Sequence, residues 1–223
     1  MRRSWRTEWP SLGLLAAMIV LSALAWPAAP DRIAVHWGPS GEPDRFGGRL
    51  EGLATVPAAA VALYVLMTVV PRFDPLRQNY ARFEGAYAGL RALVIAFLAA
   101  LHAIVVAGAL GRRVPVSVAV PLVCAGLFAA IGGLLDRLQP TWFVGIRTPW
   151  TLSSEASWVK THRLGRRLFM AMGGATGLLA VMRVPWVYGA VLGMLLGVSA
   201  LLIVYSYVAW KHDPHRTRPG IPP

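Results

Sequence analysis

The sequence has little charge and a single cysteine. Only 14% of its 223 residues are charged, whereas soluble domains carry about 25%. This deficit, together with a hydrophobic content of 56%, argues against a soluble globular domain. The one cysteine, Cys124, cannot form a disulfide within the chain.

Catalytic patterns are missing as well. The chain has no Ser, His, Asp order typical of hydrolases, no phosphate-binding glycine loop with a lysine, and no H-E-x-x-H pair. An enzymatic function therefore has no support in the sequence. We expect neither catalytic residues nor a cofactor.

Long apolar segments dominate the chain instead. Each is close to the length that crosses about 30 Å of hydrocarbon as a helix, and strands facing lipid are disfavoured because unpaired backbone groups there are costly. The segments lie at about residues 11–29, 53–71, 88–110, 115–135, 168–184 and 186–209. We therefore expect an all-α integral membrane protein with a six-transmembrane-helix bundle.

The basic residues lie between these segments. The net charge of +12 therefore indicates membrane topology and lipid contact rather than direct nucleic acid binding. With a cytoplasmic N-terminus, most of the 22 lysines and arginines fall on the cytoplasmic side, and an even number of spans places both termini there. The outward-facing exceptions are Arg32, Arg45, Arg49, Arg112, Arg113 and Arg183.

The tryptophans lie at or just outside the ends of the predicted spans, as expected for an interfacial aromatic belt. They are Trp5, Trp9, Trp26, Trp37, Trp142, Trp150, Trp158, Trp186 and Trp210.

Glycines four residues apart mark helix faces that can approach one another closely. They are Gly189, Gly193 and Gly197 in the last segment, Gly173 and Gly177 in the fifth, and Gly85 and Gly89 in the third. Two interpretations stay open for them, packing within the bundle and an oligomer interface through Gly189, Gly193 and Gly197.

A polar loop at about residues 27–52 should face outward. Residues 32–37 form a candidate short strand, and residues 38–44 contain strong turn signals. His36, Glu42 and Asp44 are candidate ligands for a metal or a cationic group. Alternatively, His36 and Asp44 make local hydrogen bonds that fix the loop, because paired metal-ligand spacing such as H-x-x-x-H is missing.

A second polar loop, at about residues 136–167, should face the cytoplasm. Ser153 or Ser154 is a candidate N-cap, and Glu155 would then lie in the first turn of a helix. This amphipathic helix runs through Trp158 and His162 into the fifth segment and is basic, which suits an anionic headgroup layer. It either orients the fifth span or serves as a docking site for a cytoplasmic or lipid partner.

One ionisable residue, His102, lies within the third apolar segment. Ionisable side chains inside spans are candidates for function. A neutral histidine bonded to a neighbouring helix is an equally good interpretation.

The two polar loops resemble parts of the SdpI-type immunity protein family of bacteria. Residues 144–155, Val-Gly-Ile-Arg-Thr-Pro-Trp-Thr-Leu-Ser-Ser-Glu, with Trp158 and the Thr-His-Arg-Leu-Gly stretch at 161–165, are similar to its C-terminal signature. The candidate functional residues there are Gly145, Arg147, Thr148, Pro149, Trp150, Ser153, Glu155, Trp158 and His162.

The outer loop resembles the uncharacterised N-terminal domain that often accompanies this family. The matching residues are Ile33, His36, Trp37, Gly41 and Asp44, with Glu42 a further candidate. Gly38 stands where that domain commonly has asparagine.

The resemblance implies a multi-pass protein of the bacterial inner membrane that confers toxin immunity. The best-known member of the family also recruits a cytoplasmic repressor, so the expected partners are a secreted peptide toxin outside and a repressor inside. We expect a two-span unit at 1–75 and a four-span domain at 76–223. The alternatives are a small transporter or channel-like protein using His102 and a metal-binding membrane enzyme using the outer loop.

Overall fold

The computed structural model describes residues 5–218. Residues 1–4 and 219–223 lie outside the described residues, and they include Arg2 and Arg3 of the topology prediction. Long helices make up most of the fold. They are α1 (Trp5–Ala25), α2 (Arg49–Val69), α3 (Glu84–Ala109), α4 (Val116–Leu135), α5 (Glu155–Val181) and α6 (Val187–Lys211). Short 3-10 helices are η1 (Val70–Arg72), η2 (Arg77–Arg82) and η3 (Thr151–Ser153). Two strands, β1 (Ile33–Trp37) and β2 (Pro43–Gly47), complete the fold.

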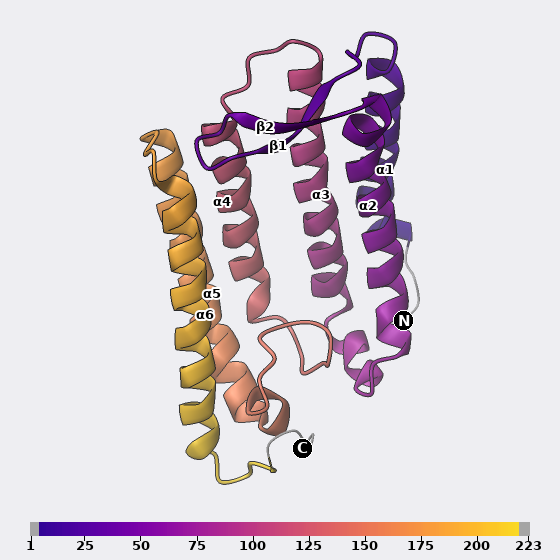
Figure 1. The fold of residues 1–223 in the computed structure, drawn as a ribbon. Helices are drawn as coiled ribbons and strands as arrows, with labels where there is room; N and C mark the ends of the chain where they lie inside the picture. Colours follow the sequence, from indigo (N-terminus) through magenta and orange to yellow (C-terminus); the bar gives the residue numbers. More distant parts are fainter. Residues whose placement is uncertain (1–4, 219–223) are drawn as a thin grey trace.

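The helices form two packed groups. Helix α3 packs against α1 and α2, α5 packs against α4 and α6, and the α3–α4 contact joins the groups. Figure 1 shows the strands at one end of the bundle, and the start of α5 with the end of α6 at the other. The predicted division at residue 75 into a two-span and a four-span unit stays a prediction.

Among the described residues, five helices are long and apolar enough to cross a membrane. They are α1, α2 extended through η1, α3, α4 and α6. Helix α5 is not among them, because its first half carries Lys160, Arg163, Arg166 and Arg167. The predicted fifth span, residues 168–184, overlaps the apolar second half of α5, and the expected total of six spans stays a prediction.

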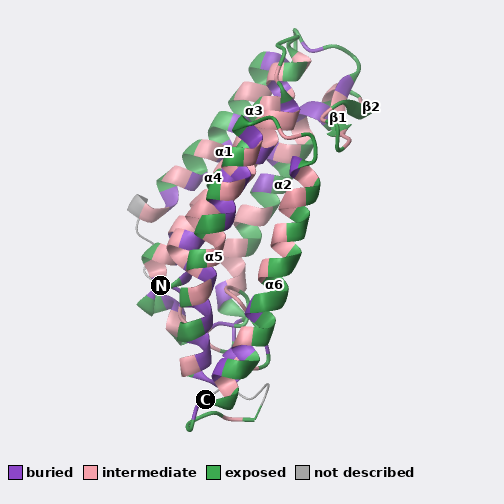
Figure 2. Ribbon diagram, turned by 90° about the vertical axis from the view of Figure 1, so that its left-hand side faces the viewer, coloured by how far each residue is buried: buried purple, intermediate pink, exposed green. Residues whose placement is uncertain are grey.

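The outer faces of the helices are apolar. Leu24, Leu178, Leu192 and Leu196 are each more than half exposed, and exposed residues run along the outside of α6 in Figure 2. Contiguous exposed apolar surface of this kind marks a membrane or partner contact. A multi-pass membrane protein is the class that this surface defines.

The predicted strand at residues 32–37 is confirmed as β1, which pairs antiparallel with β2. Ile33 anchors this hairpin in a buried cluster with Ala29, Leu53 and Val106. Strand β2 was not predicted, because its residues are exposed except at Gly47 and show no alternation of polar and apolar side chains. The hairpin therefore caps the helix ends and reaches the core through Ile33 of β1.

Glycines bring α4 and α5 into close contact. A Cβ at Gly173 would lie 2.8 Å from the backbone oxygen of Ala125, and one at Gly132 would lie 2.7 Å from Cγ of Met170. The packing role predicted for Gly173 is therefore confirmed. Packing within the bundle is wrong for Gly189, Gly193 and Gly197, because added Cβ atoms there would meet nothing within 4 Å.

Replacement of Gly173 by alanine should destabilise the fold, whereas the same change at the adjacent Gly174 should not. A Cβ at Gly173 would collide with the backbone of α4, while one at Gly174 would enter open space. Overpacking of this kind costs about 1–3 kcal/mol, so thermal unfolding in detergent should show a Tm several degrees lower for Gly173→Ala. Equal Tm values for the two variants would contradict the α4–α5 contact.

Candidate functional site

The residues of the family-like signature lie in one compact unit. It consists of the signature loop (residues 136–154), the first turns of α5 and the last turns of α6, at the lower end of the molecule in Figure 1. The hairpin lies at the opposite end, so the two polar loops singled out from the sequence do not meet.

Threonine side chains hold the turn at residues 146–151. Oγ1 of Thr151 donates to the carbonyl of Ile146 at 2.9 Å and accepts from the N–H of Thr148 at 2.9 Å. Oγ1 of Thr148 accepts from the N–H of Thr151 and lies 2.9 Å from Oγ of Ser206 on α6. Both threonines are buried, so the turn is fixed both within itself and to α6.

His162 connects the loop to α5. Its Nδ1 lies 2.9 Å from the carbonyl of Trp158, and its Nε2 lies 3.0 Å from the backbone N–H of Ile146. A carbonyl only accepts, so the proton is on Nδ1, and Nε2 accepts from Ile146. Burial lowers the pKa of His162 to about 4, with the bond to the Trp158 carbonyl acting in the opposite direction. The imidazole is therefore neutral at physiological pH and has both nitrogens bonded.

Trp158 is part of the core. Its position at a predicted span end had suggested an interfacial belt, and that prediction is wrong for this residue. The side chain is 1% exposed, stacks on His162 at 4.0 Å between ring centroids, and donates from Nε1 to the carbonyl of Leu138 at 2.9 Å. It closes the buried cluster that contains Tyr80, Phe83 and Leu135.

Gly145 is required by its position. Its backbone φ of +111° is a conformation that residues with a side chain rarely adopt. A Cβ there would also lie 2.6 Å from Nε2 of His162. The loop backbone can thus approach the imidazole only through a glycine.

The start of α5 is tied to the segment after α6. Ser154 is the N-cap, which confirms one of the two predicted candidates, and its Oγ accepts from the N–H of Ser157. The same Oγ donates to Oδ2 of Asp213 at 2.5 Å, and this bond lowers the pKa of the Asp213 carboxyl. The N–H of Thr217 donates to the carbonyl of Ser153, whose Oγ donates to the carbonyl of Pro149.

The remaining signature residues lie on the surface. Arg147 and Pro149 are exposed, Glu155 is exposed in the first turn of α5 as predicted, and Trp150 is half-buried against Tyr207. Nη1 of Arg147 donates to the carbonyl of Trp142 at 2.6 Å. The signature therefore divides into a buried set that builds the loop and an exposed set that faces outward.

The structure adds residues that sequence reasoning missed. Oδ2 of the buried Asp74 accepts from Tyr80 Oη at 2.9 Å and from the N–H of Trp142 at 3.0 Å. Burial, and next the neighbouring Asp74, raise the pKa of Tyr80. Nδ2 of Asn79 also donates to the carbonyl of Pro140. A charged residue followed by proline at 74–75 gave a turn signal, but nothing local linked it to the signature loop.

The outer residues make local bonds. Nδ1 of His36 donates to Oδ1 of Asp44 at 2.6 Å across the hairpin, which is one of the two predicted alternatives. Gly41, at φ +82°, approaches Ser117 at the start of α4, and Trp37 is half-buried. Within residues 5–218, no group of three His, Cys, Asp or Glu side chains is placed to hold a metal ion, so Glu42 does not complete a site with His36 and Asp44.

His102 is fully buried between α1, α2 and α3. Its Nε2 lies 2.9 Å from Oγ of Ser22, and this hydroxyl donates to the carbonyl of Leu53 at 2.7 Å. The histidine is thus bonded to a neighbouring helix, as one of the two interpretations expected.

Comparison with known proteins narrows the class. Residues 137–209 match the SdpI/YfhL protein family, and residues 13–61 match a domain of unknown function, DUF1648. The first match covers most of the signature loop, all of α5 and most of α6. The two matches confirm the predicted resemblance and its N-terminal companion. No curated protein and no solved structure matches the chain. The SdpI/YfhL family is not a known enzyme family and suggests an immunity or membrane protein.

Folding stability should fall as pH decreases from about 6.5 to about 4, and His162 should cause part of this loss. In that window an unfolded histidine binds a proton, whereas folded His162 does not, so protons favour unfolding. The contribution amounts to about 3 kcal/mol at most. Denaturation at pH 7.5 and pH 4.5 should show a smaller loss in His162→Gln, which cannot titrate. An identical pH dependence in both proteins would contradict the buried neutral imidazole.

Proposed function

We propose that the protein is a toxin-immunity protein of the bacterial cell membrane, and that its signature loop relays the bound state to a cytoplasmic regulator. One observation carries the proposal. Buried Thr148, Thr151 and His162 hold the signature loop in one conformation, and that loop displays Arg147 at the surface. An exposed arginine on a loop held in one conformation suits binding of a partner protein better than catalysis.

The displayed surface has the composition of a binding patch. Trp142 and Phe143 are 37% and 44% exposed, and Arg147 is bonded to the backbone of Trp142. Aromatic residues and arginine are enriched where protein interfaces bind most strongly. Arg147 with its two aromatic neighbours is therefore our candidate contact for the regulator.

The proposal includes six spans with both termini in the cytoplasm. The fifth span would be the second half of α5 and the sixth would be α6. The basic first half of α5 would then lie at the cytoplasmic interface. Figure 1 supports this arrangement, because the first turns of α5 and the last turns of α6 extend beyond the lower ends of α1–α4. The count of basic residues on either side favours the same orientation.

A path of contacts connects the two ends. The turn at Gly41 lies against Ser117 at the start of α4, and Oη of Tyr188 on α6 donates to the carbonyl of Val116. Helix α4 in turn packs closely on α5, which carries His162. A toxin bound at the hairpin would shift the signature loop only through different affinities for two arrangements of these helices.

A homo-oligomer through α6 is also part of the proposal. Gly189, Gly193 and Gly197 are uncovered within the chain, and small residues at this spacing allow close helix approach between membrane proteins.

Survival of a deletion strain in toxin-containing culture supernatants tests the function. The strain should be protected by the restored gene and should lose protection with Arg147→Ala, because the exposed guanidinium is removed without loss of a buried contact. Arg167→Ala removes an equally exposed charge on α5 outside the signature loop and should still protect. His36→Ala should weaken protection by releasing the hairpin bond to Asp44.

Full protection by both Arg147→Ala and His36→Ala, at unchanged protein levels, would overturn the proposal. A transporter that uses His102 would instead show substrate flux in proteoliposomes that is lost in His102→Ala.

A further inference from the structure

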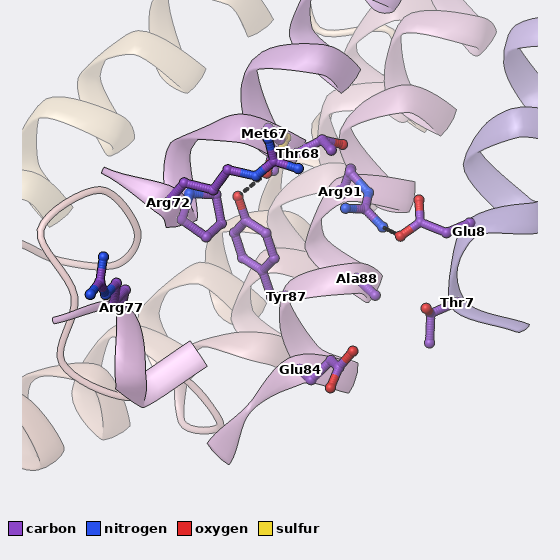
Figure 3. A pocket seen from close by; sticks show the side chains of 11 residues that line it. Thr7, Glu8, Met67, Thr68, Arg72, Arg77, Glu84, Tyr87, Ala88 and Arg91 are labelled. Carbon is purple, nitrogen blue, oxygen red and sulfur yellow. Dashed lines mark hydrogen bonds and ion pairs between the residues drawn. The ribbon is translucent and has the colours of Figure 1, made fainter. Parts of the chain in front are cut away.

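A second polar site lies within the N-terminal helices, away from the signature loop. A cavity of about 370 Å³ opens among α1, the end of α2 with η1, η2 and the start of α3. Figure 3 shows Glu8, Thr68, Arg72 and Arg91 among the side chains around it. Cavities of a few hundred Å³ are large enough for a small ligand or a headgroup.

Arg91 is fixed in the wall of this cavity. It lies about two turns into α3, is 4% exposed, and donates from Nη2 to Oε1 of Glu8 at 2.6 Å. Oη of Tyr64 donates to the other oxygen of Glu8, and the Tyr64 ring lies 5.3 Å from the Arg91 guanidinium. A buried ion pair costs considerable desolvation energy. Stability alone is therefore a weak reason for a charge at this position.

Two polar atoms at this cavity have no hydrogen-bond partner among the described residues. They are Nε of Arg91 and Oγ1 of Thr68. Buried donors are almost always bonded, so these two atoms lack partners that a ligand with acceptor oxygens would supply.

Arg72 and Arg77 also line the cavity. Both are exposed, and neither has an ion-pair partner within residues 5–218. In Figure 3 the side chain of Arg72 extends toward Thr68, and Arg91 turns toward Glu8. The arginines of this cavity outnumber its carboxylates, Glu8 and Glu84.

We propose that this cavity binds a phosphate group, carried by an anionic phospholipid headgroup or by a small phosphorylated solute. Phosphate supplies negative charge and several acceptor oxygens, which is what guanidinium groups and a free hydroxyl recognise. The cavity lies where α2 ends and α3 begins, the level at which headgroups meet helix ends. This site is independent of the proposed immunity function.

Binding to the full-length purified protein tests the site with two probes. Inorganic phosphate is titrated calorimetrically in nonionic detergent, and thermal stability is compared in nanodiscs of phosphatidylglycerol and of phosphatidylcholine. For whichever of the two probes binds, Arg72→Gln should weaken the affinity by about tenfold or more. Arg82→Gln is the matched control, because Arg82 is equally exposed on η2 but does not line the cavity.

Thr68→Val provides a second variant that should keep the fold, since its hydroxyl makes no bond within the described residues. It should weaken the same response by about threefold or more. A response to phosphate identifies a soluble ligand, and a response to phosphatidylglycerol alone identifies a headgroup. No response to either probe, or an equal loss in Arg82→Gln, would overturn the proposal.

Discussion

The backbone N–H of Ile146 donates to Nε2 of His162, and the arrangement of the signature loop depends on this bond. It requires a neutral imidazole with the proton on Nδ1, and the Trp158 carbonyl enforces that tautomer. It also requires a backbone that passes close to the ring, which only Gly145 permits. Once Ile146 is placed, its carbonyl accepts from Thr151 and the turn through Thr148 follows. Most signature residues therefore serve the geometry of the loop, and few are left to contact a partner.

Hydrophobic patterning predicted most of the fold, because lipid imposes the same apolar requirement along a whole helix. It failed at α5, where basic residues occupy the first half of a continuous helix. Periodicity could find β1 but not β2, whose side chains are almost all exposed. Local spacing identified the signature loop. It could not separate buried Thr148 from exposed Arg147, because that division is made by Ser206 on α6, 58 residues away.

The buried ion pair of the N-terminal helices was not predicted, for a related reason. Glu8 and Arg91 are single charges near the ends of apolar segments, and Arg91 taken alone is explained as a topology signal. Their ion pair joins residues 83 positions apart, so no local pattern reveals it. Arg91 within an otherwise apolar helix was the available signal, because an ionisable residue in a span needs a partner. For the glycines of α6, the pattern predicted a contact that the bundle does not make. Their spacing indicates close helix packing but does not identify the partner helix.

The two matched domains meet through a segment that belongs to neither. Residues 13–61 and 137–209 carry the family matches, yet Asp74 lies between them and holds the N–H of Trp142 at the start of the signature loop. Asn79 holds the carbonyl of Pro140 in the same way. Because Asp74 also accepts from Tyr80, which packs in the cluster around Trp158, the turn after α2 and the signature loop form one unit. A displacement of α2 would therefore reach the signature loop through this turn, by a route separate from the contact of Gly41 with Ser117 on α4.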